Sequence, residues 1–151
     1  MEDLLKQIHQ TGYWRVLIHP TEFQQERIPR LSDCQDIVEK AKVGLRGWDY
    51  PHVQYNQIRR GQDWIESSVD FMGHIAYWRF YQSGQFIHHF SSREETVLGK
   101  RGLEIVATIY QFTEILEFAA RLATKGVHSQ EAVISVILSN IKGYSLFFQD
   151  F

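Results

Sequence analysis

The feature that most constrains the fold is a run of short segments between Val53 and Ser92 that are separated by turn residues. The segments are rich in aromatic and β-branched residues, which favour strands, and they span 53–59, 63–71, 75–82 and 85–92. The connections contain Gly61, Met72-Gly73 and Ser83-Gly84. Connections this short join antiparallel strands, because parallel strands need a crossover of a dozen or more residues. The sequence therefore predicts a four-stranded antiparallel meander.

A long helix is predicted after the meander, over residues 103–125, because apolar residues recur there at helical spacing until Gly126 ends the pattern. At about 1.5 Å per residue it would span roughly 35 Å and could lie across the whole sheet. Two shorter helices are predicted at residues 2–10 and 32–43. Ser32 and Gln35 have the spacing of a capping box at the start of the second one.

Three further strands complete the expected fold. Residues 13–19 alternate apolar and polar side chains, and Pro20 stops them. Residues 131–140 are rich in β-branched aliphatics and favour a strand, with a helix capped by Ser129 as the alternative. A final strand is predicted at 144–148. Helices packed on a mostly antiparallel sheet define the α+β class, here as a single domain over residues 1–151.

The hairpin between 75–82 and 85–92 decides which side chains share a face. If Ser83-Gly84 is the whole loop, Arg79 faces His88 and Tyr81 faces Phe86 on one side of the sheet. A bulge would shift this register by one residue and exchange the faces.

The composition limits the class of protein. The chain has 151 residues, of which 44% are hydrophobic and 23% charged, as in an ordinary globular domain. Its net charge of −2 argues against a dedicated polyanion binder. Cys34, the one cysteine, is expected to be a half-buried small residue, although a helix start could also activate a catalytic thiol. With no signal peptide and no apolar run of about 18 residues, we expect a cytoplasmic protein without membrane contact.

The most unusual stretch joins the second helix to the meander, and it reads Leu45-Arg46-Gly47-Trp48-Asp49-Tyr50-Pro51-His52. It could be a binding site, because arginine holds carboxylate or phosphate groups bidentately. With the hairpin residues it gives a set of candidate ligand-binding residues, namely Arg46, Trp48, Asp49, His52, Arg79, Tyr81 and His88. It could equally be a structural corner, in which Trp48 anchors the core and Arg46 pairs with Asp49 or binds the carbonyls that end the preceding helix.

No standard catalytic motif is present. A metal site could use Asp49 and His52 with His88 or His89, but only one of the adjacent histidines could join, because neighbours on a strand point to opposite faces. A hydrolase could use Asp49 with His52 or His88 as the base. A nucleic-acid accessory domain could use basic groups near aromatics, at Arg59-Arg60 beside Tyr55 and Trp64 and at Lys100-Arg101, against which the negative net charge argues.

The residues 45–52, followed by Trp78-Arg79 and by Tyr81-Gln82-Ser83-Gly84-Gln85-Phe86, resemble a pattern in uncharacterised bacterial proteins. In some of these, the pattern resembles a region that accompanies a Schlafen-like AlbA_2 DNA-binding domain. The resemblance covers the middle of the chain and extends toward the long helix. It implies an accessory domain in bacterial regulatory or defence-like proteins. It carries over no catalytic residue or cofactor, and a DNA-binding role does not transfer because the AlbA_2 part is not evident here.

Together these patterns favour a non-enzymatic binding, sensing or regulatory module over an enzyme. The high aromatic content, 14% of the residues, and the apolar C-terminal residues indicate protein contacts, with a homo-oligomer or another protein as partner. A small anionic ligand is the other expected partner, and no cofactor is expected.

Overall fold

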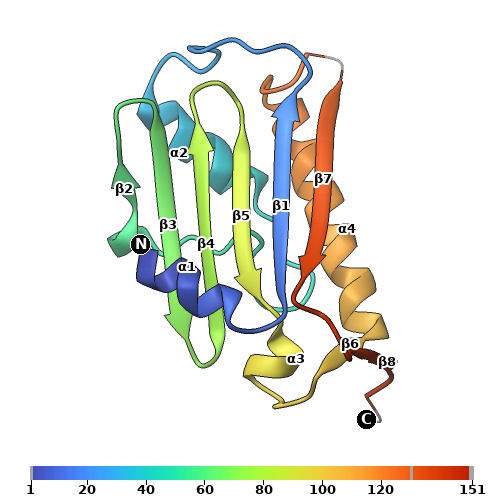
Figure 1. Ribbon diagram of the computed structural model, residues 1–151. Helices are drawn as coiled ribbons and strands as arrows, with labels where there is room; N and C mark the ends of the chain where they lie inside the picture. The colour runs from blue at the N-terminus through green and yellow to red at the C-terminus, as the bar shows by residue number, and fades with distance from the viewer. Residues whose placement is uncertain (1, 130, 150–151) are drawn as a thin grey trace.

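The computed structural model describes residues 2–129 and 131–149, and it has the α+β architecture expected from the sequence. A six-stranded antiparallel sheet forms its centre, with the strand order β2-β3-β4-β5-β1-β7 (Figure 1). The strands are β1 (Tyr13–Pro20), β2 (Arg59–Arg60), β3 (Trp64–Phe71), β4 (His74–Tyr81), β5 (Phe86–Ser91) and β7 (Ala132–Ser139). A separate parallel pair joins β6 (Gly102–Glu104) to β8 (Ser145–Phe147). The predicted meander is therefore confirmed as β2 to β5, with β1 and β7 as flanking strands.

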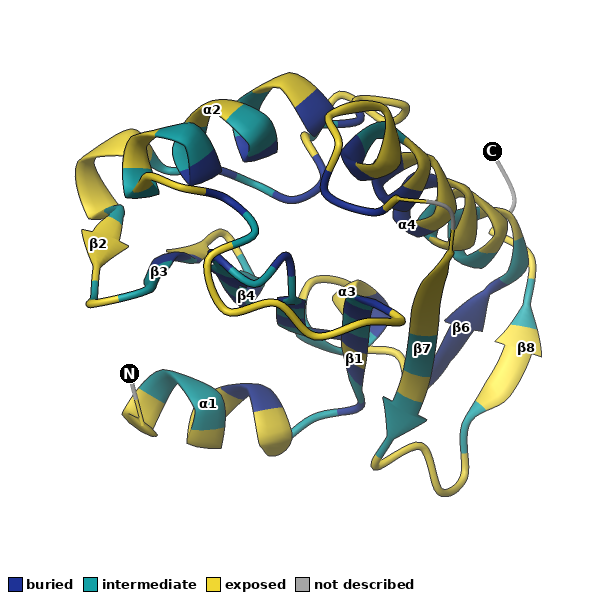
Figure 2. Cartoon of the chain, turned by 90° about the horizontal axis from the view of Figure 1, so that it is seen from above, coloured by how far each residue is buried: buried dark blue, intermediate teal, exposed yellow. Residues whose placement is uncertain are grey.

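The helices cover the sheet unequally. The helices α2 (Leu31–Ala41) and α4 (Ile105–Thr124) lie over one face, whereas α1 (Glu2–His9) lies over the other (Figure 2). The main core is buried under α2 and α4 and includes Trp78, Phe80, Phe86, Ile115 and Phe118. A smaller cluster, made by Ile8, Ile75 and Tyr77, lies under α1. Two short elements complete the chain, the one-turn helix α3 (Arg93–Thr96) and the 3-10 turn η1 (Tyr55–Gln57).

Most predicted elements are confirmed, including the strand at 131–140, which is β7. The first strand of the meander is shorter and later than predicted: the segment 53–59 contains η1, and only Arg59 of it belongs to the two-residue strand β2. A strand that packs one face needs apolar residues at every second position. Here Val53 is buried, but Tyr55 is 61% exposed and polar residues follow it, so the alternation fails after one residue.

The predicted capping box is wrong. Helix α2 begins at Leu31, so Arg30 and not Ser32 occupies the N-cap position, and no side chain caps it. Arg30 instead donates two hydrogen bonds to the Asp33 carboxylate, at 3.0 and 2.9 Å. An acid in the first turn also interacts favourably with the helix dipole.

The loop between β4 and β5 has three residues, Gln82, Ser83 and Gly84, and not the two that the sequence suggested. Gly84 has φ +85°, which is the left-handed conformation that closes a three-residue hairpin loop. The register is therefore shifted by one residue, and Trp78 lies opposite His88. Because side chains alternate along a strand, His88 faces the α2–α4 side with Trp78, whereas Arg79 and Tyr81 face the other side.

Candidate functional site

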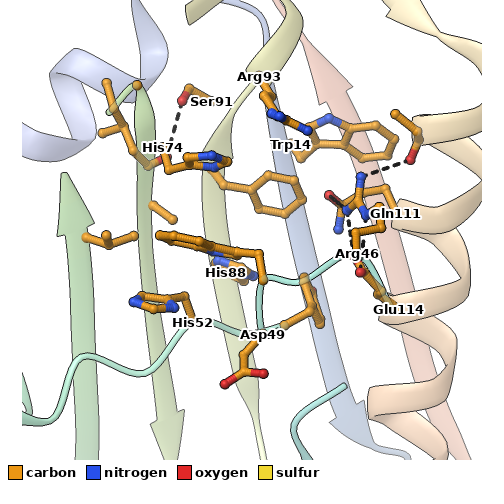
Figure 3. Close-up of a pocket in the computed structure, with 18 of the residues that line it drawn as sticks. Trp14, Arg46, Asp49, His52, His74, His88, Ser91, Arg93, Gln111 and Glu114 are labelled. Atoms are coloured by element: carbon orange, nitrogen blue, oxygen red, sulfur yellow. Dashed lines mark hydrogen bonds and ion pairs between the residues drawn. The ribbon is translucent and has the colours of Figure 1, made fainter. Parts of the chain in front are cut away.

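A cavity of about 320 Å³ lies on the helix-covered face, between the sheet, the loop 44–52 and the start of α4 (Figure 3). Strands β1, β4 and β5 form its floor, and α3 and α4 close one side. Its aromatic and charged or amide lining residues are Trp14, Arg46, Trp48, Asp49, Tyr50, His52, His74, His88, Phe90, Arg93, Glu94, Gln111 and Glu114. Five of the seven candidate residues therefore meet here, namely Arg46, Trp48, Asp49, His52 and His88.

The loop is closed by a backbone bridge. Val43 and Tyr50 exchange two hydrogen bonds of 2.9 and 2.8 Å, and Tyr50 is buried against Phe118 of α4. Gly47 has φ +76°, a conformation that glycine adopts most readily. The sequence thus folds residues 44–49 into a projecting wall of the cavity.

Arg46 ties this wall to α4. Its Nη2 lies 2.5 Å from Oε2 of Glu114 and its Nε 3.2 Å from Oε1, and it also donates to the carbonyl of Ala107 and the side chain of Gln111. The Glu114 side chain is 2% exposed. The expected pairing of Arg46 with Asp49 is wrong, because Asp49 lies 3.1 Å from Lys42. The charge of Arg46 is therefore already compensated inside the protein.

Trp48 is stacked between two histidines. Its ring centroid lies 4.2 Å from that of His52 and 4.5 Å from that of His74. Burial lowers the pKa of both imidazoles, and the charge of Arg93 lowers that of His74 further, so both are neutral near pH 7. The expectation that Trp48 plugs the core is wrong, because the indole is half-buried in the cavity wall.

Three buried polar groups along the cavity have no hydrogen-bond partner among residues 2–129 and 131–149: the Tyr50 hydroxyl, both ring nitrogens of His88 and Nε2 of Gln111. His88 is 4% exposed and Tyr50 5%, and their ring centroids are 5.1 Å apart. Burial lowers the pKa of His88 to about 3, so the ring is neutral and offers one donor and one acceptor. Most buried polar groups are paired, so this cluster needs an explanation.

Arg93 is a functional candidate that the sequence did not single out. It lies in α3 at the edge of the cavity and points toward Trp14 (Figure 3). Within the described part of the chain it makes no ion pair, whereas the neighbouring Glu94 accepts hydrogen bonds from Ser92 and the backbone of Glu104. Arg93 is followed by Glu94 and Glu95 in a charged stretch of the sequence, and no local pattern there indicates that it lies at a cavity.

Arg79 and Tyr81, the other two candidates, lie on the opposite face of the sheet. Arg79 donates to Oε2 of the buried Glu66 at 2.9 and 2.7 Å and stacks on Trp64, 4.1 Å from the ring centroid. It also donates to the Tyr81 hydroxyl. Arg59 binds the second oxygen of Glu66 at 2.7 Å. This is a satisfied ionic cluster that supports strands β2 to β4, and it leaves no group directed at a ligand.

The arrangements that an enzyme or a metal site would need are not assembled in the described residues. Asp49, His52 and His88 line the same cavity, but no hydrogen bond joins their side chains, and the Asp49 carboxylate points away from Trp14 and Arg93 (Figure 3). No group of three or more histidine, cysteine, aspartate or glutamate side chains is placed to hold a metal ion in residues 2–129 and 131–149.

The basic groups considered for nucleic acid are held by neighbours. Arg59 pairs with Glu66, and Arg60 donates to Gln35. Lys100 lies over the ring of Phe147, and Arg101 donates to the carbonyl of Lys142. Glu66 compensates the charge of Arg59 and Glu95 lies 3.8 Å from Arg101, whereas Arg60 and Lys100 contact neutral groups and keep their charge. The two ion pairs reduce the net positive charge available for phosphate neutralisation, on which such binding depends.

Comparison of the chain with protein-family models, curated proteins and solved structures gave no match. Within the described residues, no helix combines the length and the apolar character needed to cross a bilayer. The resemblance to the AlbA_2-associated region stays a prediction.

Proposed function

We propose that the protein is a non-enzymatic binding module that holds a small, flat, anionic ligand in the cavity beneath the loop 44–52. The observation that carries this proposal is the cluster of buried, unpartnered polar atoms of Tyr50, His88 and Gln111 along an aromatic-walled cavity. A buried polar group without a partner costs about 1–3 kcal/mol. A ligand that hydrogen-bonds to all three would recover much of that cost.

The walls favour a ring-shaped ligand. Trp14 and Phe90 offer flat apolar surfaces, whereas Trp48 offers only its edge because His52 and His74 cover its faces. The cavity volume of about 320 Å³ lies at the lower end of small-molecule sites. The polar edge of such a ring would face Tyr50 and His88 in the interior. Its anionic group would face Arg93 at the edge of the cavity, because the charge of Arg46 is compensated by Glu114.

This assignment revises the ligand-binding set. Arg93 replaces Arg46 and Arg79 as the cation for the ligand, while Arg46 and Glu114 hold the wall in place. A sensing or regulatory role within a larger bacterial protein would use this site as its input, and it remains part of the proposal.

Calorimetry with two matched probes tests the proposal. We choose 4-hydroxybenzoate as the anionic probe and 4-hydroxybenzamide as its neutral counterpart, and native mass spectrometry of the purified protein tests for a retained small molecule. The benzoate should bind more tightly than the benzamide, and Arg93→Gln should remove that difference. Tyr50→Phe, which removes only a hydroxyl, should weaken binding about fivefold to tenfold. Arg30→Gln, which removes the surface ion pair between the N-cap residue of α2 and Asp33, is the matched control.

Two results would contradict the proposal. One is the absence of both a retained molecule and any probe binding. The other is binding that Tyr50→Phe, His88→Phe and Arg93→Gln leave unchanged, which would mean that the buried polar groups serve only enclosed water.

A further inference from the structure

The outer edge of β7 differs from the other edge of the same sheet. At the opposite edge, β2 has two residues, and both are arginines. Short, charged edges prevent strands of other molecules from pairing with them. Strand β7 has eight residues, Ala132 to Ser139, and contains no charged residue and no proline. It pairs with β1 in unbroken register from Tyr13↔Ser139 to Pro20↔Ala132, so no bulge twists it away. None of the described strands pairs with its outer side.

An apolar stripe on α4 accompanies this edge. Ile109, Phe112 and Leu116 are spaced by three and four residues, so they share one side of the helix, and they are 61%, 40% and 54% exposed. Phe112 contacts Trp14 of β1, next to β7, which places the stripe on the β7 side of the helix. Figure 2 shows α4 above β7, with exposed residues along its outer side. The stripe carries no charge.

Strand β7 contributes exposed apolar side chains on both of its faces. Val136 packs against the main core, so Ile134 and Leu138 share the face that lies under α4. Val133 and Ile137 point to the other face and are each 43% exposed. Such an edge has unpaired backbone groups and is flanked by apolar side chains on both faces of the sheet. Edges of this kind are suited to pair with a strand of another molecule.

We infer that the β7 edge and the α4 stripe form the interface of a homodimer, in which β7 pairs antiparallel with β7 of a second copy. A two-fold axis perpendicular to the sheet joins the two copies into one continuous sheet, and both α4 stripes then lie on the same face on either side of the axis. The inference is independent of the cavity and of its ligand.

The extent and the charge of this surface fit a second copy. An eight-residue strand at about 3.4 Å per residue is about 27 Å long, and the sheet and helix layers together are about 20 Å deep. The outline, on the order of 500 Å² before side-chain relief is counted, is comparable to the roughly 800 Å² that each partner buries in a standard interface. Without charge at its centre the surface does not select a charged partner, and a net charge of −2 per chain opposes self-association only weakly.

Sedimentation equilibrium of the full chain tests the inference, and twice the 17.8 kDa chain mass is expected. Ile137→Glu should weaken the dimer on the order of a hundredfold, because it puts like charges close to the two-fold axis. It should not impair folding, since Arg15 lies opposite Ile137 on β1 and can pair with the new acid. Leu116→Glu tests the α4 stripe in the same way and is independent of strand stability.

The matched control is Phe71→Glu, which alters a 56% exposed phenylalanine on β3, far across the sheet. It should leave the dimer intact, and circular dichroism should show all three variants folded. A wild-type chain that stays monomeric over its whole range of solubility would overturn the inference. So would a dimer that Ile137→Glu and Leu116→Glu leave unchanged, because the contact would then lie elsewhere, and so would equal disruption by Phe71→Glu.

Discussion

Removing Arg46 should destabilise the protein far more than removing an arginine from a surface pair. Glu114 is almost completely buried in α4, and Arg46 is its ion-pair partner among the described residues. Arg46→Met keeps the length of the aliphatic stem but leaves the carboxylate in an apolar site. Breaking a buried pair by removing one partner costs about 3–5 kcal/mol. Because the Arg46 side chain is itself 26% exposed, water can reach part of the site, and we expect the lower value, about 3 kcal/mol.

The asymmetry of the pair provides the sharper test. Glu114→Met leaves behind an arginine that can turn toward solvent, so it should cost less than Arg46→Met. The double variant replaces the pair by apolar groups of similar length and should be more stable than Arg46→Met alone, since a buried ion pair is often neutral relative to a hydrophobic pair. A double-mutant cycle isolates this coupling.

Urea denaturation and thermal melting of the four proteins measure these effects. A loss of about 3 kcal/mol corresponds to a drop in Tm of about 6–12 °C for a domain of this size. Arg30→Met, which removes the exposed pair with Asp33, is the control and should lower Tm far less. If Arg46→Met costs less than about 1 kcal/mol, or the double variant is no more stable than Arg46→Met, the buried pair does not hold the loop as described.

Three further predictions concern titration, backbone conformation and thiol reactivity. Burial holds the pKa of His88 at about 3 and that of His89 at about 4, below the ordinary 6.5, so the unfolded chain binds more protons between roughly pH 6.5 and 4. The free energy of unfolding should therefore keep its full value above pH 6.5 and fall as the pH is lowered, by up to about 1.4 kcal/mol per pH unit for each group. In urea titrations, His88→Phe should reduce the slope of this pH dependence by the contribution of one proton. Gly84→Ala should destabilise more than Gly47→Ala in thermal melts, because both glycines have positive φ but only the new Cβ at Gly84 would approach Val127, to 2.9 Å. Cys34 is fully buried, and burial raises its thiol pKa to about 12, so a thiol reagent should modify it only at the rate of unfolding; rapid modification of the native protein would contradict this.

The elements of the fold were predictable because each rests on a local pattern. The alternation in β1, the helical spacing in α4 and the β-branched run in β7 all depend on residues within one element. The segment 53–59 misled the prediction because Val53 and Ile58 gave it apolar character without period two. The parallel pairing of β8 with β6 was not predicted, because no local pattern indicates which distant strand a three-residue segment joins.

The site was predictable only in part, and the errors have two origins, a pairing between residues far apart in the sequence and a shifted hairpin register. Arg46, Trp48, Asp49 and His52 lie together because they are neighbours in sequence. The meeting of Arg46 with Glu114 spans 68 residues, and no charge pattern near either residue reveals it. Arg79 was misplaced because one extra loop residue at the β4–β5 hairpin exchanges every side chain between the two faces of β5. The same shift brought His88 into the cavity without Arg79.

Helix α4 contributes to both the cavity and the proposed interface, and its geometry keeps the two separable. Successive residues of an α-helix are about 100° apart, so Glu114 and Leu116 are about 200° apart around the axis. Glu114 accordingly faces Arg46 and is buried, whereas Leu116 is 54% exposed on the β7 side. The effect of a substitution at Leu116 is therefore measured as a change in dimerisation, and that of a substitution at Arg46 as a change in the free energy of unfolding. Only a change that moves the whole helix would alter both readouts together.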